Sequence, residues 1–316
     1  MPAFLKRLAL SLCTGVIFVG WSEVMFWARP MPGTSLRELI PTTLAYSIAA
    51  YVFLWLVDAF CARSFEAVFL AGAAFGWLVE GVVVQTLYEQ MPLSLSFTGL
   101  AWHALLTVGV GWYLIPRRLA NGRLGRLACL AALIGVAYGL WAVWWWTEAP
   151  PPLPWRAFAG YAWPSSVVLI LAYAIAGRIR LPAFRPSRVE AVLLTIVGLA
   201  YFGFVTVPAD SRALWVLPPL AGVILLTLRR NVQVDSRQDF TTLPQKPASI
   251  SWAASLLLLL IPLAATTIYA VFEWIGWRPA TGYVLYLVTV PTGFFLFLRS
   301  IWRIWRRLPS TDIVRG

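Results

Sequence analysis

Charged residues are scarce in this chain, and histidine and cysteine are scarcer still. Asp, Glu, Lys and Arg make up 12% of the sequence, against roughly 25% in soluble globular domains. The single histidine, His103, excludes metal and haem sites built from several imidazoles. The three cysteines are odd in number and lack metal-ligand spacing, which argues against a zinc site or a disulfide framework. The sequence therefore predicts no metal and no cofactor.

Several common enzyme motifs are also missing. There is no H-E-x-x-H metal motif, no G-x-S-x-G nucleophile motif and no glycine-rich loop of the kind that cradles phosphates. These absences favour a function other than catalysis. An intramembrane enzyme acting on a lipid stays open.

The chain has long hydrophobic runs instead, and hydrophobic residues make up 60% of it. A helix needs about 20 apolar residues to cross roughly 30 Å of hydrocarbon. We therefore predict an all-α fold, a polytopic bundle of about ten transmembrane helices forming a single domain. The predicted spans are 7–28, 39–61, 65–88, 95–116, 126–146, 161–177, 190–207, 213–228, 252–272 and 282–302. The basic and apolar N-terminus resembles a secretory signal but lacks an A-x-A cleavage site, so it is taken as the first span.

Basic residues fall in alternate loops between these spans. Of the 25 lysines and arginines, five lie on one side and the other 20 on the opposite side. Because cytoplasmic loops carry the excess of Lys and Arg, this asymmetry predicts that both termini are cytoplasmic and that the protein is a multi-pass protein of the cell membrane. The five residues of the minority side are Arg29, Arg37, Arg156, Arg212 and Arg278.

Three stretches outside the spans carry further predictions. Residues 229–250 have mixed charges and two prolines and are predicted to form a cytoplasmic linker, with a docking site for a partner as the alternative. Ser35 and Glu38 have the spacing of a capping box at the start of the second helix. Residues 303–316 are predicted to form a basic tail at the membrane interface.

The last span and its tail repeat Trp and Arg at helical spacing. Trp prefers the headgroup level and Arg is attracted to anionic lipid, so we predict an anchor to anionic lipids of the cytoplasmic face. Its residues are Arg299, Trp302, Arg303, Trp305, Arg306 and Arg307. Many of the 18 tryptophans, including Trp21, Trp146 and Trp274, lie near external span ends, where an aromatic belt is expected. Other membrane subunits remain candidate partners, whereas nucleic acid is not expected.

Glycine and one ionisable residue share a face on the third and fourth spans. Gly72, Gly76 and Glu80 are spaced by four residues on the third span, and so lie on one side of a helix. The fourth span repeats this spacing with Gly99, His103, Thr107 and Gly111. Small residues at this interval let helices approach closely in a membrane. We predict packing seams at Gly72, Gly76, Gly99 and Gly111.

Depth indicates that the ionisable residues meet. At about 1.5 Å per residue, Glu23 and Glu80 lie roughly 20 to 23 Å from the cytoplasmic ends of their helices, and His103 lies roughly 18 Å from its own. Tyr46, on the second span, falls at a similar height. We therefore predict a protonatable site of Glu23, Glu80 and His103, with Tyr46, in the outer half of the membrane. Separate structural hydrogen bonds for each residue are the alternative.

Three functions are compatible with these features. A small-molecule or ion transporter is favoured, because intramembrane ionisable residues commonly bind substrates or protons. A structural subunit of a membrane assembly would need only the packing seams, and a lipid-modifying enzyme would use His103 as a base. The length, span number and orientation are similar to those of the drug and metabolite transporter superfamily. Residues 1–150 and 151–316 lack the self-similarity of that superfamily's two halves, so the likeness implies no role for any residue.

Overall fold

The computed structural model describes residues 2–30, 39–148, 152–235 and 252–307. Helices account for nearly all of these residues, and the described part of the chain contains no strand. Ten helical segments are long and apolar enough to cross a membrane, which confirms the predicted all-helical multi-pass architecture. Several spans combine two or three consecutive elements, because the helix changes its winding along its length.

The first five spans run as follows: α1 (Ala3–Val19), η1 (Gly20–Val24) and α2 (Met25–Trp27); α3 (Leu39–Ala59); α4 (Phe65–Leu78) and η2 (Val79–Val83); η4 (Leu95–Leu114) and α5 (Ile115–Ala120); and α6 (Leu124–Glu148). The second five are α7 (Trp155–Ala176); α8 (Arg188–Tyr201), η5 (Phe202–Thr206) and α9 (Val207–Ala209); α10 (Ala213–Asp235); α11 (Trp252–Leu257) and α12 (Leu260–Ile275); and α13 (Thr281–Arg306). A 3₁₀ turn, η3 (Thr86–Tyr88), lies between the third and fourth spans.

The number of spans agrees with the prediction, and most ends agree to within a few residues. The third span is one exception, because it ends at Val83 and not at residue 88. Gln85 has a left-handed backbone with φ 67°, which stops the helix and turns the chain back on itself. The sixth span begins at Trp155, six residues earlier than predicted.

Two predicted segments are partly helical instead. The predicted linker begins at residue 229, yet α10 continues to Asp235; the rest of the linker lies outside the described residues. The predicted tail begins at residue 303, yet α13 continues to Arg306, and residues 308–316 lie outside the described part. The predicted capping box at Ser35 and Glu38 also falls outside it.

Contacts between helix ends show that α1 begins and α13 ends at the same end of the bundle. Arg7, near the start of α1, forms an ion pair with Glu190, near the start of α8, and also bonds the hydroxyl of Tyr51 in the second half of α3. A short turn joins the end of α3 to the start of α4, where Glu66 pairs with Arg303 of α13. We call this the basic end of the bundle, because arginines concentrate there.

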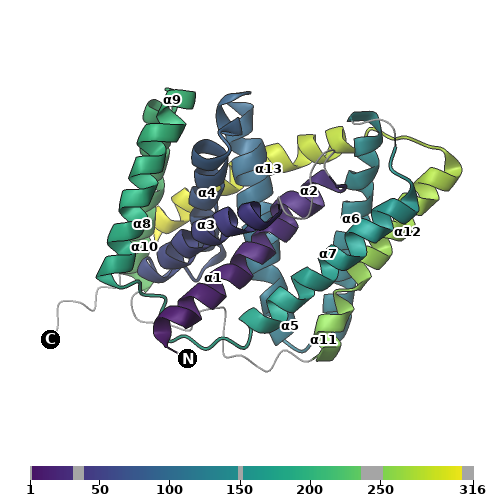
Figure 1. Cartoon of the computed structure of the whole chain (residues 1–316), viewed down its shortest axis with the longest axis horizontal. Coiled ribbons are helices and arrows are strands. Elements are labelled where there is room, and N and C mark those ends of the chain that lie inside the picture. Colours follow the sequence, from purple (N-terminus) through teal and green to yellow (C-terminus); the bar gives the residue numbers. More distant parts are fainter. Residues whose placement is uncertain (1, 31–38, 149–151, 236–251, 308–316) are drawn as a thin grey trace.

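Four elements form the centre of the bundle, namely α1, α3, α4 and η4. Figure 1 shows α6, α7 and α12 gathered on one side of this centre, and α8, α9 and α10 on the other. The tenth span, α13, crosses behind the centre and contacts α4, η4, α6 and α10. The first, third and fourth spans are the most buried, whereas α8 has no buried residue and exposes valine, leucine and isoleucine on several sides. In a membrane protein such surfaces face lipid.

The seam between α4 and η4 is very close. A Cβ atom on Gly76 would lie 2.4 Å from the carbonyl oxygen of Gly99, and one on Gly72 would lie 3.1 Å from the Cα of Ala104. Phe18, Phe53 and Phe75 fill the adjoining core, with ring centroids of Phe18 and Phe75 4.3 Å apart. The seam therefore brings the backbones of the third and fourth spans into direct contact, and it fixes which side chains meet further along.

Candidate functional site

Glu80 and His103 meet in the interior of the bundle. The Nε2 atom of His103 lies 2.7 Å from Oε1 of Glu80. His103 is 2% exposed, and the side chain of Glu80 is 12% exposed. Gly76, one helical turn before Glu80, belongs to the glycine seam that holds α4 and η4 together. Backbone packing therefore sets the distance between the side chains of Glu80 and His103.

Two hydroxyls continue this contact on the other side of the imidazole. Ser22 Oγ lies 2.9 Å from Nδ1 of His103 and 2.9 Å from the hydroxyl of Thr107. Ser22 and Thr107 are both buried. Because a hydroxyl can donate or accept, two arrangements satisfy every atom. A neutral imidazole accepts from Ser22 at Nδ1 and donates to Glu80, whereas an imidazolium donates at both nitrogens. Both arrangements use the same heavy-atom positions.

The second oxygen of Glu80 is bonded by a residue from beyond the span. The hydroxyl of Thr86, in η3, donates to Oε2 of Glu80. This contact exists because the third span ends at Val83 and the chain folds back through the left-handed Gln85. Sequence analysis missed Thr86, since a helix continued to residue 88 would carry it away from Glu80.

Glu23 forms a second polar group beside the first. The hydroxyl of Tyr46 donates to Oε1 of Glu23 at 2.5 Å, and the indole of Trp27 donates to Oε2 at 3.0 Å. Glu23 directly follows Ser22 in the chain, and the rings of Tyr46 and His103 are 6.4 Å apart between centroids. The four residues predicted to share a site thus lie in two adjoining hydrogen-bonded groups, joined through the Ser22–Glu23 segment.

All three ionisable residues of this cluster lie in π-helical turns. In η1 the amide of Met25 bonds the carbonyl of Gly20, and in η2 the amide of Val84 bonds that of Val79, both five residues back. His103 lies in η4, which is π-helical from Leu95 to Leu114. Such winding is rare and is frequently found at functional sites. It gives the side chains of Glu23, Glu80 and His103 directions that an α-helical reading of the sequence does not predict.

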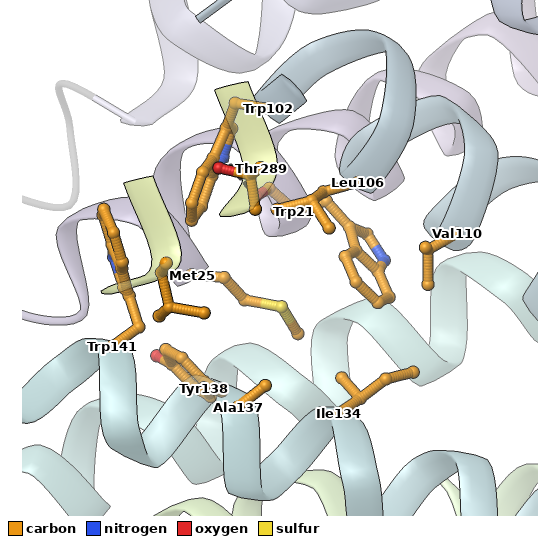
Figure 2. A pocket seen from close by; sticks show the side chains of 11 residues that line it. Trp21, Met25, Trp102, Leu106, Val110, Ile134, Ala137, Tyr138, Trp141 and Thr289 are labelled. Carbon is orange, nitrogen blue, oxygen red and sulfur yellow. Dashed lines mark hydrogen bonds between the residues drawn. The ribbon is translucent and has the colours of Figure 1, made fainter. Parts of the chain in front are cut away.

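An aromatic pocket lies on the other side of η1. It has a volume of about 170 Å³, and Figure 2 shows Met25 reaching into its middle with the rings of Trp21 and Trp141 on either side. Trp102 and Tyr138 line it further, and Leu285 and Thr289 contribute from α13. Its surface is almost wholly apolar, and neither Glu80 nor His103 is among its lining residues.

The polar atoms of these aromatic side chains bind the backbone of the first span. Trp102 donates to the carbonyl of Trp21 at 3.1 Å, and Trp141 and Trp145 donate to that of Phe26 at 2.5 and 2.8 Å. The first span ends at Trp27, and the next residue, Ala28, has a left-handed backbone with φ 53°. Phe26 lies in the last turn, where carbonyls have no partner within the helix, so the indoles of Trp141 and Trp145 satisfy its carbonyl. The pocket surface left to contact a ligand therefore consists largely of aromatic ring faces.

Comparison of the chain with protein-family models, with curated proteins and with solved structures finds no match. The site therefore has to be interpreted from its own geometry. Within the described residues, no group of three His, Cys, Asp or Glu side chains is placed to hold a metal ion.

The other residues singled out from the sequence have varied surroundings. Gly99 and Gly111 face the indole rings of Trp77 and Trp21, so each packs against a side chain, whereas Gly72 and Gly76 pack against η4. In the predicted lipid anchor, Arg303 and Arg307 pair with Glu66. Trp305 bonds the hydroxyl of Thr227, and Arg306 stacks on Trp302 with 4.3 Å between Cζ and the ring centroid. Arg299 forms none of these contacts, and headgroup binding stays a prediction for the group.

The aromatic belt needs a correction. Trp21 and Trp146 are buried and donate to the hydroxyls of Tyr173 and Tyr269, so they belong to the core. Trp274 is 86% exposed, as a residue at the membrane surface would be.

A polar cluster at the basic end was missed by sequence analysis. Arg7 donates to both oxygens of Glu190 at 2.9 and 2.7 Å, and Tyr51 donates to Oε1 of Glu190 at 3.0 Å. Glu190 also completes a capping box with Ser187 at the start of α8. The S-x-x-E pattern of residues 187–190 could have indicated this helix start. No sequence pattern indicates that the same carboxylate pairs with Arg7.

Proposed function

We propose that this protein is a membrane transporter in which Glu80 and His103 bind a proton that is coupled to substrate movement. The observation that carries the proposal is the 2.7 Å contact between the two side chains inside a ten-span bundle. Ionisable groups at such a depth are costly and mark substrate or proton pathways by default. The hydroxyls of Ser22, Thr107 and Thr86 support it, because they can follow a change of proton position by rotating.

The aromatic pocket beside the cluster offers a place for an apolar or aromatic substrate. Trp21 and Met25 line the pocket, and Ser22 and Glu23 belong to the polar cluster, so both features share the short η1 segment. A substrate displacing Met25 would press on the same turn that holds Ser22 against His103. In this proposal η1 connects substrate binding to protonation.

The orientation we propose places the basic end in the cytoplasm. Arginines at helix ends, such as Arg7, Arg63 and Arg117, concentrate at the end of the bundle where α1 begins. The positive-inside rule then puts both ends of the described bundle in the cytoplasm, and the Glu80–His103 pair in the outer half of the membrane. Cysteine labelling from each side of sealed vesicles, at a cysteine introduced at position 180 or position 212, tests this orientation.

The function is tested by reconstituting the protein in vesicles and recording substrate-induced charge movement for amines, metal cations, organic acids and apolar aromatic compounds. We expect at least one class to give a signal that depends on pH in wild type and is lost in Glu80→Gln. Glu89→Gln removes an exposed carboxylate from a loop and serves as the matched control. A signal from Glu80→Gln with the wild-type pH dependence would contradict the proposal.

A structural subunit is the second candidate, and the filled interior favours it. His103, Ser22 and Thr107 are buried and satisfied by one another, as in a network that only joins helices. Under this reading Glu80→Gln and His103→Gln would both unfold the protein, and no compound would raise the melting temperature of wild type. A lipid-modifying enzyme is less well supported, because the lining of the aromatic pocket contains no carboxylate, imidazole, amine or thiol.

A further inference from the structure

A groove at the basic end lies between the end of the fourth span and the start of the fifth. Its volume is about 370 Å³. Its lining residues are Leu114, Arg118, Arg126, Cys129, Leu130 and Leu133. A short turn through Gly122, with φ 64°, reverses the chain between α5 and α6 and brings the two arginines to one groove. We call it the Arg118 groove.

The two arginines of this groove have no carboxylate partner among the described residues, unlike Arg7 and Arg303. At the same end of the bundle, Arg7 pairs with Glu190, and Arg303 pairs with Glu66. Among the residues that the structure describes, neither Arg118 nor Arg126 has an ion pair or hydrogen bond with another side chain. Two guanidinium groups that share a groove and lack an anion are suited to a phosphate, which they can bind through parallel hydrogen bonds.

The rest of the groove lining consists of three leucines and Cys129. Leu130 and Leu133 follow Arg126 along α6, about 6 and 10 Å further into the membrane at 1.5 Å per residue. Leu133 is 62% exposed, although leucine is strongly apolar. The groove thus has a cationic end at the headgroup level and a hydrocarbon wall that runs inward from it.

We propose that the Arg118 groove binds one anionic phospholipid, with its phosphate between Arg118 and Arg126 and an acyl chain along Leu130 and Leu133. Charge complementarity selects the headgroup, and the leucine wall distinguishes a lipid from free phosphate. Basic pockets between transmembrane helices are known to recognise lipid headgroups in this way. The site is separate from the Glu80–His103 cluster and does not depend on the function proposed for it.

The test measures lipid binding to the full-length protein purified in a neutral detergent. Phosphatidylglycerol is titrated against wild type and Arg118→Gln/Arg126→Gln, and binding is followed by native mass spectrometry and by the melting temperature. We expect each arginine to contribute about fivefold in affinity, from roughly 1 kcal/mol per basic residue near the membrane surface. Arg123→Gln/Arg180→Gln removes the same charge from exposed positions outside the groove and should bind phosphatidylglycerol as wild type does.

Other ligands and variants separate the remaining explanations. Phosphatidylcholine binding as tightly as phosphatidylglycerol would overturn the role of charge. Inorganic phosphate or glycerol phosphate stabilising the protein as well as the lipid would overturn the role of the acyl chain. An equal loss of binding in the control variant would show diffuse attraction and also contradict the site. If the double variant does not fold, Arg126→Gln alone, at an exposed position, should still weaken binding about fivefold.

Discussion

Arg303, in the last turns of the tenth span, donates to Oε1 of Glu66, in the first turn of the third span, at 2.7 Å across 237 positions of sequence. Arg307 approaches the other oxygen of Glu66 at 3.6 Å. The two helices are therefore joined by charge at the basic end, as well as by packing. Arginines that looked like lipid anchors from the sequence have an internal carboxylate as their partner.

Glu66→Gln should lower stability slightly. Glu66 is largely buried but the side chain of Arg303 is 46% exposed, and pairs with an exposed partner contribute about 1 kcal/mol or less. Thermal unfolding in detergent should show a lower melting temperature, and high salt should reduce the difference between variant and wild type. Glu148→Gln, at an exposed position, is the control. A loss as large for Glu148→Gln would contradict the assignment.

Gly76→Ala should be much more damaging than a glycine substitution elsewhere. The added Cβ would lie 2.4 Å from the Gly99 carbonyl oxygen and 2.8 Å from the Cβ of His103, so η4 would have to move. Overpacking of this kind costs about 1–3 kcal/mol. Gly160→Ala, on α7 with open space around it, should be neutral or stabilising by up to about 1 kcal/mol. Equal unfolding temperatures for the two variants would refute the close seam.

Thr107→Val should lower stability while keeping the side-chain volume. Thr107 is fully buried and its hydroxyl bonds Ser22, so valine leaves Ser22 with one partner fewer, at a cost of about 1–3 kcal/mol. Thr292→Val removes an exposed hydroxyl that bonds its own helix and should change little. The measurement is the free energy of unfolding, and if both variants match wild type the hydroxyl network does not stabilise the fold.

The turn between α9 and α10 should give a small dependence of stability on pH. Arg212 bonds both oxygens of Asp210 and holds the pKa of that carboxyl below its usual value. Because the pKa of Asp210 is lower in the folded than in the unfolded protein, its contact with Arg212 stabilises the fold above the unfolded-state pKa. This stabilisation is lost as the pH falls through the folded-state pKa. Asp210→Asn should remove this acid-dependent loss, as should 1 M salt, where the screening length is about 3 Å. The free energy of unfolding, measured for wild type and Asp210→Asn between neutral and strongly acidic pH, checks this prediction.

The neighbouring Tyr88 should stay neutral over the same range and beyond it. Burial and the charge of Asp210 raise its pKa to about 12. Absorbance titration of the folded protein should therefore show this tyrosine ionising after the exposed ones. A phenolate signal for Tyr88 near pH 10, identified by its loss in Tyr88→Phe, would contradict the described surroundings.

The spans could be predicted because length and apolarity indicate them, and the meeting of Glu80 with His103 was expected from counting residues along straight helices. The end of the third span could not, because it depends on the left-handed Gln85 and on Thr86 turning back to Glu80. No local sequence pattern predicts that the chain turns back at Gln85 and brings Thr86 to Glu80.

The sequence also did not indicate which residues of distant helices form hydrogen bonds with Glu23 and His103. Glu23 was expected beside His103, but its two oxygens are bonded by Tyr46 and Trp27, and the imidazole is bonded by the adjacent Ser22. The π-helical winding of η1 decides which of two neighbouring side chains faces which group. Helical periodicity of 3.6 residues per turn does not contain this information.

The indoles that bind the carbonyls of Trp21 and Phe26 have a consequence for movement. They come from η4 and α6, and the indole of Trp21 in turn bonds Tyr173 of α7, whose hydroxyl donates to Gly111. The C-terminal part of the first span is thereby fixed in its axial position against three other helices. Because this part of the first span is held on three sides, an opening that exposed His103 would have to come from a displacement of α3 or α4, which carry its neighbours Tyr46 and Phe75.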